Sequence, residues 1–208
     1  MTTAHPARVL RLSLLLLSLL YLTACTVAPP THTDNICSIF REKDGWYDDA
    51  ADARSEWYSP IPVMMAIMHQ ESRFQQKAKP PRKWIFGFIP GPRPSDAYGY
   101  SQAKDSTWET YQRSSGHYGA DRDDFADAID FIGWYNHTSR KQCGIDPNDT
   151  YHLYLAFHEG HGGFNRRSYQ DKAWLKAVAK KVSARSREYT RQLNSCEKSL
   201  QSPWWKFW

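Results

Sequence analysis

The stretch MAIMHQESRF, residues 65–74, decides the fold class, because there an apolar helical stripe runs into a carboxylate. The apolar residues up to this point follow the i, i+3, i+4, i+7 spacing of a helix face that packs on a core: Ile61, Met64, Met65 and Met68. Glu71 continues that face, and burial of an unpaired charge is costly. Glu71 is therefore either an acid of raised pKa in an apolar wall or a helix-end carboxylate that turns out to solvent or pairs with Arg73, Arg82 or Arg93.

Further helical patterns follow along the chain. We expect one or two opening helices within 36–57 with a break at Gly45, then a helix capped by Ser59 that carries Glu71. Later helices are expected at about 105–115, where Ser106 and Glu109 have capping-box spacing, at 125–140, at 149–159 with a stop at Gly160, and at about 174–193. The GHGGF stretch is expected to be a flexible connector. These patterns predict a single all-α domain over residues 37–198.

One segment interrupts the helices. Residues 77–97, KAKPPRKWIFGFIPGPRPSDA, contain too much proline for a helix and predict a loop or an irregular β-hairpin. Aromatic and branched apolar residues are frequent in it: Trp84, Ile85, Phe86, Phe88 and Ile89. They favour an ordered flap beside the Glu71 helix. Packing on the domain and contact with substrate or membrane both remain open roles for it.

The N-terminus has the features of an export signal. Arg8 and Arg11 precede an uncharged run, residues 12–22, that is too short to span a bilayer with ease. The run ends in Leu-Thr-Ala-Cys, which resembles the lipobox of bacterial lipoproteins. The resemblance implies a signal peptide over 1–24, acylation of Cys25 and a tether over 25–36. Thr26 after this cysteine implies an outer-membrane anchor facing the periplasm, and a plain signal peptide is the alternative.

Charge and aromatic content give weaker indications. The formal net charge of the 208 residues is +5, and loss of the two arginines in 1–24 leaves about +3, so no nucleic-acid partner is expected. The aromatic C-terminal stretch, within residues 199–208, either contacts a membrane interface or folds back on the domain. Protein partners cannot be identified from the sequence.

Cysteine and histidine spacing bears on disulfides and metals. With Cys25 acylated, three cysteines remain for an oxidising compartment, which suggests one disulfide and one free thiol. Spacing does not decide among the pairings; we favour Cys37 with Cys196, because this bond would join the first helix to the last, and leave Cys143 free. HEGH, residues 158–161, places its histidines three apart rather than four, so neither a zinc site nor a cofactor is expected.

Three short stretches follow one another along the chain in the order of a known set of family motifs: HQESRF, then AYGYSQ, then LAFHEGHGGF. Over residues 57–165 they resemble the SLT family of lytic transglycosylases, which share a lysozyme-like fold with goose-type lysozymes and cleave peptidoglycan. Glu71-Ser72 matches the first family motif, and residues 99–102, GYSQ, are close to the second. Residues 156–160, AFHEG, occupy the third motif with two substitutions.

The resemblance implies a mechanism for Glu71. This residue would protonate the bond between N-acetylmuramic acid and N-acetylglucosamine, and apolar surroundings would raise its pKa for that task. It would then act as base toward the muramyl 6-hydroxyl, which attacks within the substrate and yields a 1,6-anhydro end. The substrate N-acetyl group would stand in for the second carboxylate of other glycosidases.

The resemblance also implies residues that bind the glycan: Ser72, Tyr98, Tyr100, Ser101, Gln102, Phe157 and His158. The family tyrosine that orients the acid is Phe157 here, and phenylalanine has no hydroxyl. Four residues are candidates to replace it, which the sequence does not rank: Tyr100, Tyr135, Tyr154 and His158. Two other functions stay open: a hydrolytic lysozyme with Asp96 holding a water, and a peptidoglycan-binding lipoprotein with weak activity.

Overall fold

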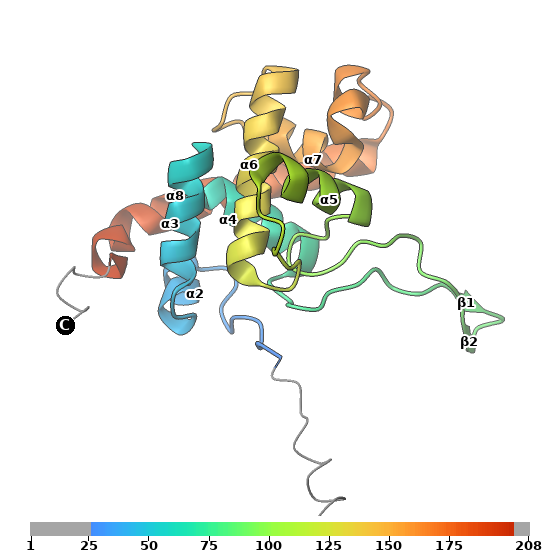
Figure 1. The fold of residues 1–208 in the computed structure, drawn as a ribbon, viewed down its shortest axis with the longest axis horizontal. Helices are drawn as coiled ribbons and strands as arrows, with labels where there is room; N and C mark the ends of the chain where they lie inside the picture. The colour runs from blue at the N-terminus through green and yellow to red at the C-terminus, as the bar shows by residue number, and fades with distance from the viewer. Residues whose placement is uncertain (1–25, 202–208) are drawn as a thin grey trace, which may run out of the picture.

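The computed structural model describes residues 26–201, in which helices are the main secondary structure (Figure 1). In chain order the helices are α2 (Ile36–Glu42), α3 (Trp46–Trp57), α4 (Ile61–Ser72), α5 (Asp105–Ser115), α6 (Phe125–Cys143), α7 (Thr150–Asn165) and α8 (Ala173–Leu200). Strands β1 (Trp84–Ile85) and β2 (Ile89–Pro90) form one short antiparallel pair. The all-α prediction is confirmed. The expected signal peptide, Cys25 and most of the C-terminal tail lie outside the described residues.

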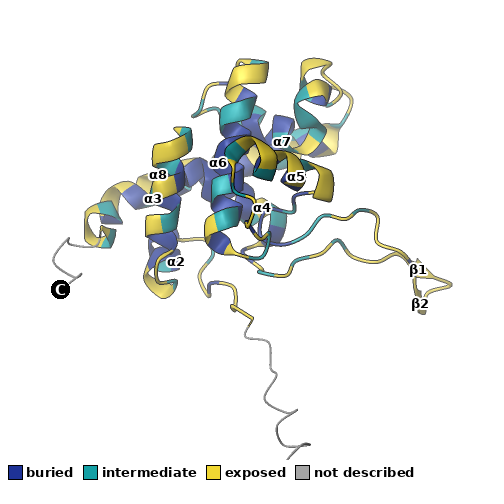
Figure 2. Ribbon diagram, in the orientation of Figure 1, coloured by how far each residue is buried: buried dark blue, intermediate teal, exposed yellow. Residues whose placement is uncertain are grey.

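Helix α4 is the centre of the core. Nine of its 12 residues are buried, and it packs against α3, α6 and α8 (Figure 2). Burial on nearly all sides holds this helix in place through the hydrophobic effect. It ends at Ser72 because Arg73 and Phe74 have left-handed φ angles of 52° and 60°. Glu71 is thus fixed in the last turn of the most buried helix.

Two predicted helix caps differ from the structure. Ser59 does not cap α4, which has Pro60 as its N-cap and Pro62 in the first turn. The Ser59 hydroxyl instead accepts a hydrogen bond of 2.9 Å from Asn136 of α6, a partner that no local pattern reveals. Ser106 likewise lies inside the first turn of α5, whose N-cap is Lys104 with no side-chain cap bond.

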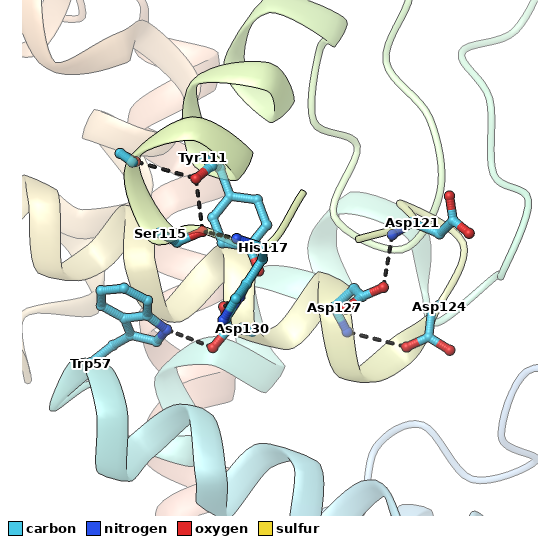
Figure 3. Close-up of polar contacts among 9 residues, drawn as sticks. Trp57, Tyr111, Ser115, His117, Asp121, Asp124, Asp127 and Asp130 are labelled. Atoms are coloured by element: carbon cyan, nitrogen blue, oxygen red, sulfur yellow. Dashed lines mark hydrogen bonds and ion pairs between the residues drawn. The ribbon is translucent and has the colours of Figure 1, made fainter. Parts of the chain in front are cut away.

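A polar hub ties three helices together (Figure 3). The Asp130 carboxylate of α6 accepts hydrogen bonds of 2.6 Å from Trp57 Nε1 of α3 and from the Tyr111 hydroxyl of α5. His117 Nδ1 lies 3.1 Å from the same carboxylate. Hydrogen bonds to a charged acceptor are stronger than neutral ones, so the hub fixes α6 against its neighbours.

The chain ends of the domain are joined covalently. Cys37 of α2 and Cys196 of α8 form a disulfide across a sequence separation of 159 residues, whereas the Cys143 thiol is free. A cross-link over so long a loop stabilises mainly by constraining the unfolded chain. The first and last described helices are therefore held side by side.

Helix α7 continues past its expected end. Gly160 has φ 74° and ψ 156°, which kinks the helix, but the helix resumes and reaches Asn165. The prediction of a flexible connector is wrong because His161 is held: its ring stacks on Tyr135 at 4.4 Å, and its Nε2 lies 2.9 Å from the Ser139 hydroxyl. Helices α6 and α8 also extend beyond their predicted ends, to Cys143 and Leu200.

The proline-rich segment is not a flap on α4. It forms an arm that projects from the helical body, with β1 and β2 at its far end (Figure 1), and residues 81–90 are all exposed. The β-hairpin alternative was the better description, although its paired strands are only two residues long. Among residues 26–201, no helix combines the length and apolar character needed to cross a membrane.

Candidate active site

Glu71 lines a cavity of about 410 Å³. Four segments form its walls: the end of α4, the chain that leads into and begins α5, the middle of α6, and α7 around its kink. The lining residues are Glu71, Ala97, Gln102, Ala103, Lys104, Thr107, Phe131, Tyr135, Phe157, His158, Glu159 and Gly160. The cavity is therefore part apolar and part polar, as ligand sites commonly are.

The Glu71 carboxyl is largely removed from water. Burial raises its pKa from the ordinary value of 4.5 to about 7, and a hydrogen bond with the Tyr154 side chain lowers the pKa in part. None of the ion pairs among the described residues involves Glu71, so pairing with a nearby arginine is not what holds it. Near neutral pH a large fraction of Glu71 carries a proton that it can donate.

Tyr154 supplies the hydroxyl that Phe157 lacks. It lies three residues earlier on α7 and is buried, and its hydroxyl interacts with the Glu71 carboxyl; burial and this carboxyl raise the pKa of Tyr154. Phe157 instead packs edge-on against Tyr135, with ring centroids 5.0 Å apart. The hydroxyl beside Glu71 thus comes from the previous turn of the same helix.

The other candidates for this role have different partners. Tyr100 packs edge-on against both Trp46 and Phe125 in the core. The Tyr135 hydroxyl donates to the Ala156 carbonyl at 3.2 Å. His158 is exposed, and its Nδ1 lies 3.2 Å from Glu159. Of these four residues, only Tyr154 has a side chain that shifts the pKa of Glu71.

A second carboxylate, Glu159, lines the same cavity in the opposite state. Its side chain is 4% exposed, and both its oxygens lie 2.8 Å from Lys172 Nζ. Burial alone would raise its pKa, but hydrogen bonds from Lys172, Ser168 and His158 outweigh burial and lower the pKa to about 2. Glu159 is thus ionised at neutral pH, and both its oxygens already have hydrogen-bonding partners in the protein. The sequence analysis did not single it out, because Lys172 is 13 residues away and nothing local marks the pair.

Comparison with protein families now adds to this geometry. Residues 13–196 match the family model described as the transglycosylase SLT domain. The chain belongs to this SLT family. Comparison with curated proteins finds no match. Membership supports a lysozyme-like helical fold and lytic transglycosylase activity on peptidoglycan in general.

In this SLT domain, a glycine turn positions the loop of the second motif. Gly99 has φ 75°, and a Cβ there would lie 1.9 Å from the Arg122 carbonyl oxygen, so no other residue fits. Gln102 follows in a left-handed conformation, and its Nε2 donates to the Ala78 and Gly99 carbonyls at 2.9 Å each. Its Oε1 is then the atom that it can offer to a ligand in the cavity.

The predicted glycan-binding residues of the SLT domain fall into two groups. Gln102, Phe157 and His158 line the cavity with Glu71. The others do not line it: Ser72, Tyr98, Tyr100 and Ser101. Their side chains lie elsewhere, since the Ser72 hydroxyl donates to the Met68 carbonyl and the Tyr98 hydroxyl donates to Asp123 at 3.0 Å. Tyr100 is a core residue, and the Ser101 hydroxyl is buried with no protein partner among the described residues.

Metal ligands are not grouped in the described part of the domain. Among residues 26–201, no three or more His, Cys, Asp or Glu side chains are arranged to hold a metal ion. The two histidines of HEGH diverge after the kink: His158 packs on Trp174 and His161 on Tyr135. Their side chains therefore do not converge on one point.

Proposed function

We propose that this chain is a peptidoglycan lytic transglycosylase. It would cleave the β-1,4 bond between N-acetylmuramic acid and N-acetylglucosamine, leave 1,6-anhydro-muramyl ends, and so take part in cell-wall remodelling. The observation that carries the proposal is Glu71, a carboxyl of raised pKa that lines a cavity of about 410 Å³. Family membership supports the general activity.

In the proposed reaction Glu71 acts twice. Its proton passes to the glycosidic oxygen as the bond from that oxygen to the muramyl anomeric carbon breaks. The resulting carboxylate accepts the proton of the muramyl 6-hydroxyl as that oxygen bonds to the anomeric carbon. The proton is recovered and no water is consumed, so one carboxyl on the protein suffices. The substrate N-acetyl oxygen would assist between the two steps.

Tyr154 is proposed to position the carboxyl through both steps. A hydrogen-bond donor stabilises a carboxylate, so the Tyr154 hydroxyl favours the form of Glu71 that accepts a proton. Burial opposes that effect and keeps the pKa near 7. The balance of the two suits a residue that must give up a proton and take one back at neutral pH.

The same cavity argues against hydrolysis as the main reaction. Most hydrolytic glycosidases use a second carboxylate, either as the base that activates water or as the nucleophile. Glu159 is ill suited, because Lys172 engages both its oxygens and its pKa is about 2. Asp96, the acid considered for this role, lines a neighbouring cavity with Tyr98 and not the one that holds Glu71. These placements favour attack by the substrate's own hydroxyl.

Glycan binding is proposed for three cavity residues. Gln102 would accept a hydrogen bond through Oε1, and Phe157 and His158 would contact the faces and hydroxyls of the sugars. The Ser101 hydroxyl, buried beside Gln102 without a partner, marks a place where the loop has unused hydrogen-bonding capacity.

The test is digestion of purified sacculi with mass analysis of the products. The wild type is expected to release muropeptides lighter by one water than their reducing-end forms, and Glu71→Gln is expected to release none while keeping its fold. Glu109→Gln, which changes an exposed glutamate of α5 outside the cavity, is the matched control. Reducing ends would support the lysozyme alternative. Absence of cleavage by the wild type would support a binding protein.

We further propose that Cys25 is acylated and anchors the mature chain in the outer membrane, facing the periplasm. The lipobox-like Leu-Thr-Ala-Cys ending supports this location. Metabolic labelling with a radioactive fatty acid tests it: the wild type should carry label, and Cys25→Ser should not. An unlabelled wild type of reduced mass would instead indicate a plain signal peptide.

A further inference from the structure

Exposed apolar side chains concentrate at the tip of the hairpin arm, which we define as residues 77–97. Nine large hydrophobic residues are exposed among those described, and five of them are consecutive or nearly so in this arm: Trp84, Ile85, Phe86, Phe88 and Ile89. Phe86 and Phe88 are 84% and 73% exposed. A patch of this kind on an otherwise polar surface marks a contact site.

The arm holds its tip away from the helical body (Figures 1 and 2). Its two sides are bonded to each other, since Gly91 N donates to the Lys83 carbonyl at 2.8 Å and Arg93 donates to the Pro80 carbonyl. Its root is bonded to the second-motif loop, since Gly99 N donates to the Ala78 carbonyl at 3.0 Å. The apolar tip is therefore presented to something outside the domain.

Charge along the arm indicates what that partner is. The arm holds five cations and one carboxylate, Asp96, which lies at the end where the arm rejoins the domain. The cations are Lys77, Lys79, Arg82, Lys83 and Arg93. Aromatic residues prefer the boundary between lipid headgroups and acyl chains, and basic residues are attracted to anionic headgroups. The apolar tip suits the boundary between headgroups and acyl chains, and the basic stem suits the anionic headgroups above it.

We propose that the hairpin arm is a membrane-docking element whose aromatic tip inserts into an anionic lipid surface while its basic stem contacts the headgroups. This function is separate from glycan cleavage. It would also set the distance of the cavity from the membrane, because Ala97 at the end of the arm lines the cavity of Glu71.

The start of the described chain lies beside the root of the arm. Val27 N donates to Gln76 Oε1 at 2.8 Å, so residue 27 is held where the arm leaves the body. If Cys25 is acylated as proposed above, the lipid anchor would emerge two residues from that point. Anchor and arm would then give two contacts with one membrane, which orients a protein where a single flexible tether does not.

Vesicle binding tests this proposal. The chain from residue 26 to 208 is the unit to use, because every helix and core residue described lies within 36–200, and it lacks both the signal segment and Cys25. It is mixed with vesicles of phosphatidylglycerol and phosphatidylcholine, or of phosphatidylcholine alone, and sedimented. Binding is expected on the anionic vesicles and to weaken as salt is added.

Three variants separate the contributions. Phe86→Ser with Phe88→Ser should lower the partition coefficient on anionic vesicles at least about tenfold, because the buried apolar area is lost. Arg82→Gln with Lys83→Gln should lower it about ten- to thirtyfold on anionic vesicles and little on neutral ones. Tyr118→Ser, which removes an aromatic 73% exposed elsewhere, should leave it unchanged.

The outcomes decide the proposal independently of the enzymatic one. Unchanged binding of the phenylalanine variant would assign membrane affinity to the C-terminal tail and overturn the role of the arm. A wild type that sediments with no vesicles would overturn it as well, as would a wild type that binds only sacculi. The arm variants should cleave isolated glycan strands as the wild type does, so loss of cleavage is not the expected readout.

Discussion

Two glutamates face one cavity, and their surroundings give them opposite charge states. Glu71 is held by buried apolar residues of α4 and one tyrosine hydroxyl, and its pKa rises to about 7. Glu159 lies beyond the kink of α7 among a lysine, a serine and a histidine, and its pKa falls to about 2. Widely separated pKa values are typical of acids with different roles, and they support the proposal that Glu71 is the proton donor and that Glu159 stays ionised.

The comparison also shows that burial alone does not decide an acid's function. Both carboxyls are poorly exposed, but only Glu159 has a cation within 2.8 Å. An apolar wall leaves the proton on the acid, whereas a nearby ammonium group removes it. The predictions below test this difference, beginning with the largest expected effect.

Removal of the proton donor should have the greatest consequence. Glu71→Gln keeps the shape of the side chain but cannot donate or accept a proton, so kcat on glycan strands should fall by about a thousandfold or more. Turnover can be followed by release of anhydro-muropeptides. Retention of more than a tenth of wild-type turnover would remove Glu71 from the chemistry.

The same substitution should stabilise the folded protein in a pH-dependent way. The folded pKa of about 7 lies above the ordinary 4.5, so below pH 4.5 the carboxyl is protonated in both states and costs nothing. Above pH 7 the folded state must bury a charge. Glu71→Gln should therefore raise the free energy of unfolding by about 3 kcal/mol at pH 8 and by little at pH 4. Denaturant unfolding at the two pH values measures this, and an equal change at both would contradict it.

Loss of the tyrosine hydroxyl should have a smaller but diagnostic effect. Tyr154→Phe removes the hydroxyl that lowers the pKa of Glu71. The pKa should therefore rise, and the alkaline limb of the profile of kcat/KM against pH should shift to higher pH. The maximal kcat should fall about ten- to a hundredfold, because the carboxyl is less well oriented. Tyr100→Phe, also buried but packed in the core, is the control and should not move the limb.

Glu159→Gln, which changes the other cavity carboxylate, should reduce the stability of the fold more than it reduces catalysis. The change leaves Lys172 without its partner, and we expect a loss of about 1–2 kcal/mol of stability and a kcat within about tenfold of wild type. The alkaline limb of the pH profile should stay in place. A loss of kcat as large as that of Glu71→Gln would make Glu159 a second catalytic carboxylate and favour hydrolysis.

The smallest effect is expected where the family motif is altered. Phe157→Tyr restores the family tyrosine, but Tyr154 already holds Glu71, so kcat should change by less than about threefold. A gain of tenfold or more would show that Tyr154 is a poor substitute. The measurement is the same release of anhydro-muropeptides.

The sequence was sufficient for features with local causes. The apolar stripe before Glu71 predicted a buried helix and an acid on it, because helical periodicity depends on near neighbours. The order of the three motifs indicated the SLT family, and a match over 13–196 shows it.

Features that depend on how helices meet could not be predicted. Tyr154 was one of four candidates, and its selection depends on the rotation of α7 against α4. The Glu159 pair with Lys172 forms across the kink at Gly160, which sequence patterns placed as a helix end. The arm was expected to be an ordered flap beside the Glu71 helix because it is aromatic. Sequence patterns do not tell whether such apolar side chains contact their own domain or project away from it.

The pKa of the Glu71 carboxyl is the quantity on which this account depends, and it can be measured directly. Carbon NMR of protein labelled at glutamate carboxyls, recorded across pH 3–10 beside Glu71→Gln to assign the signal, follows the titration of this one group. The account predicts a midpoint near pH 7 that moves upward in Tyr154→Phe. A midpoint near the ordinary 4.5 would contradict it, because Glu71 would then be an ionised carboxylate with no proton to give.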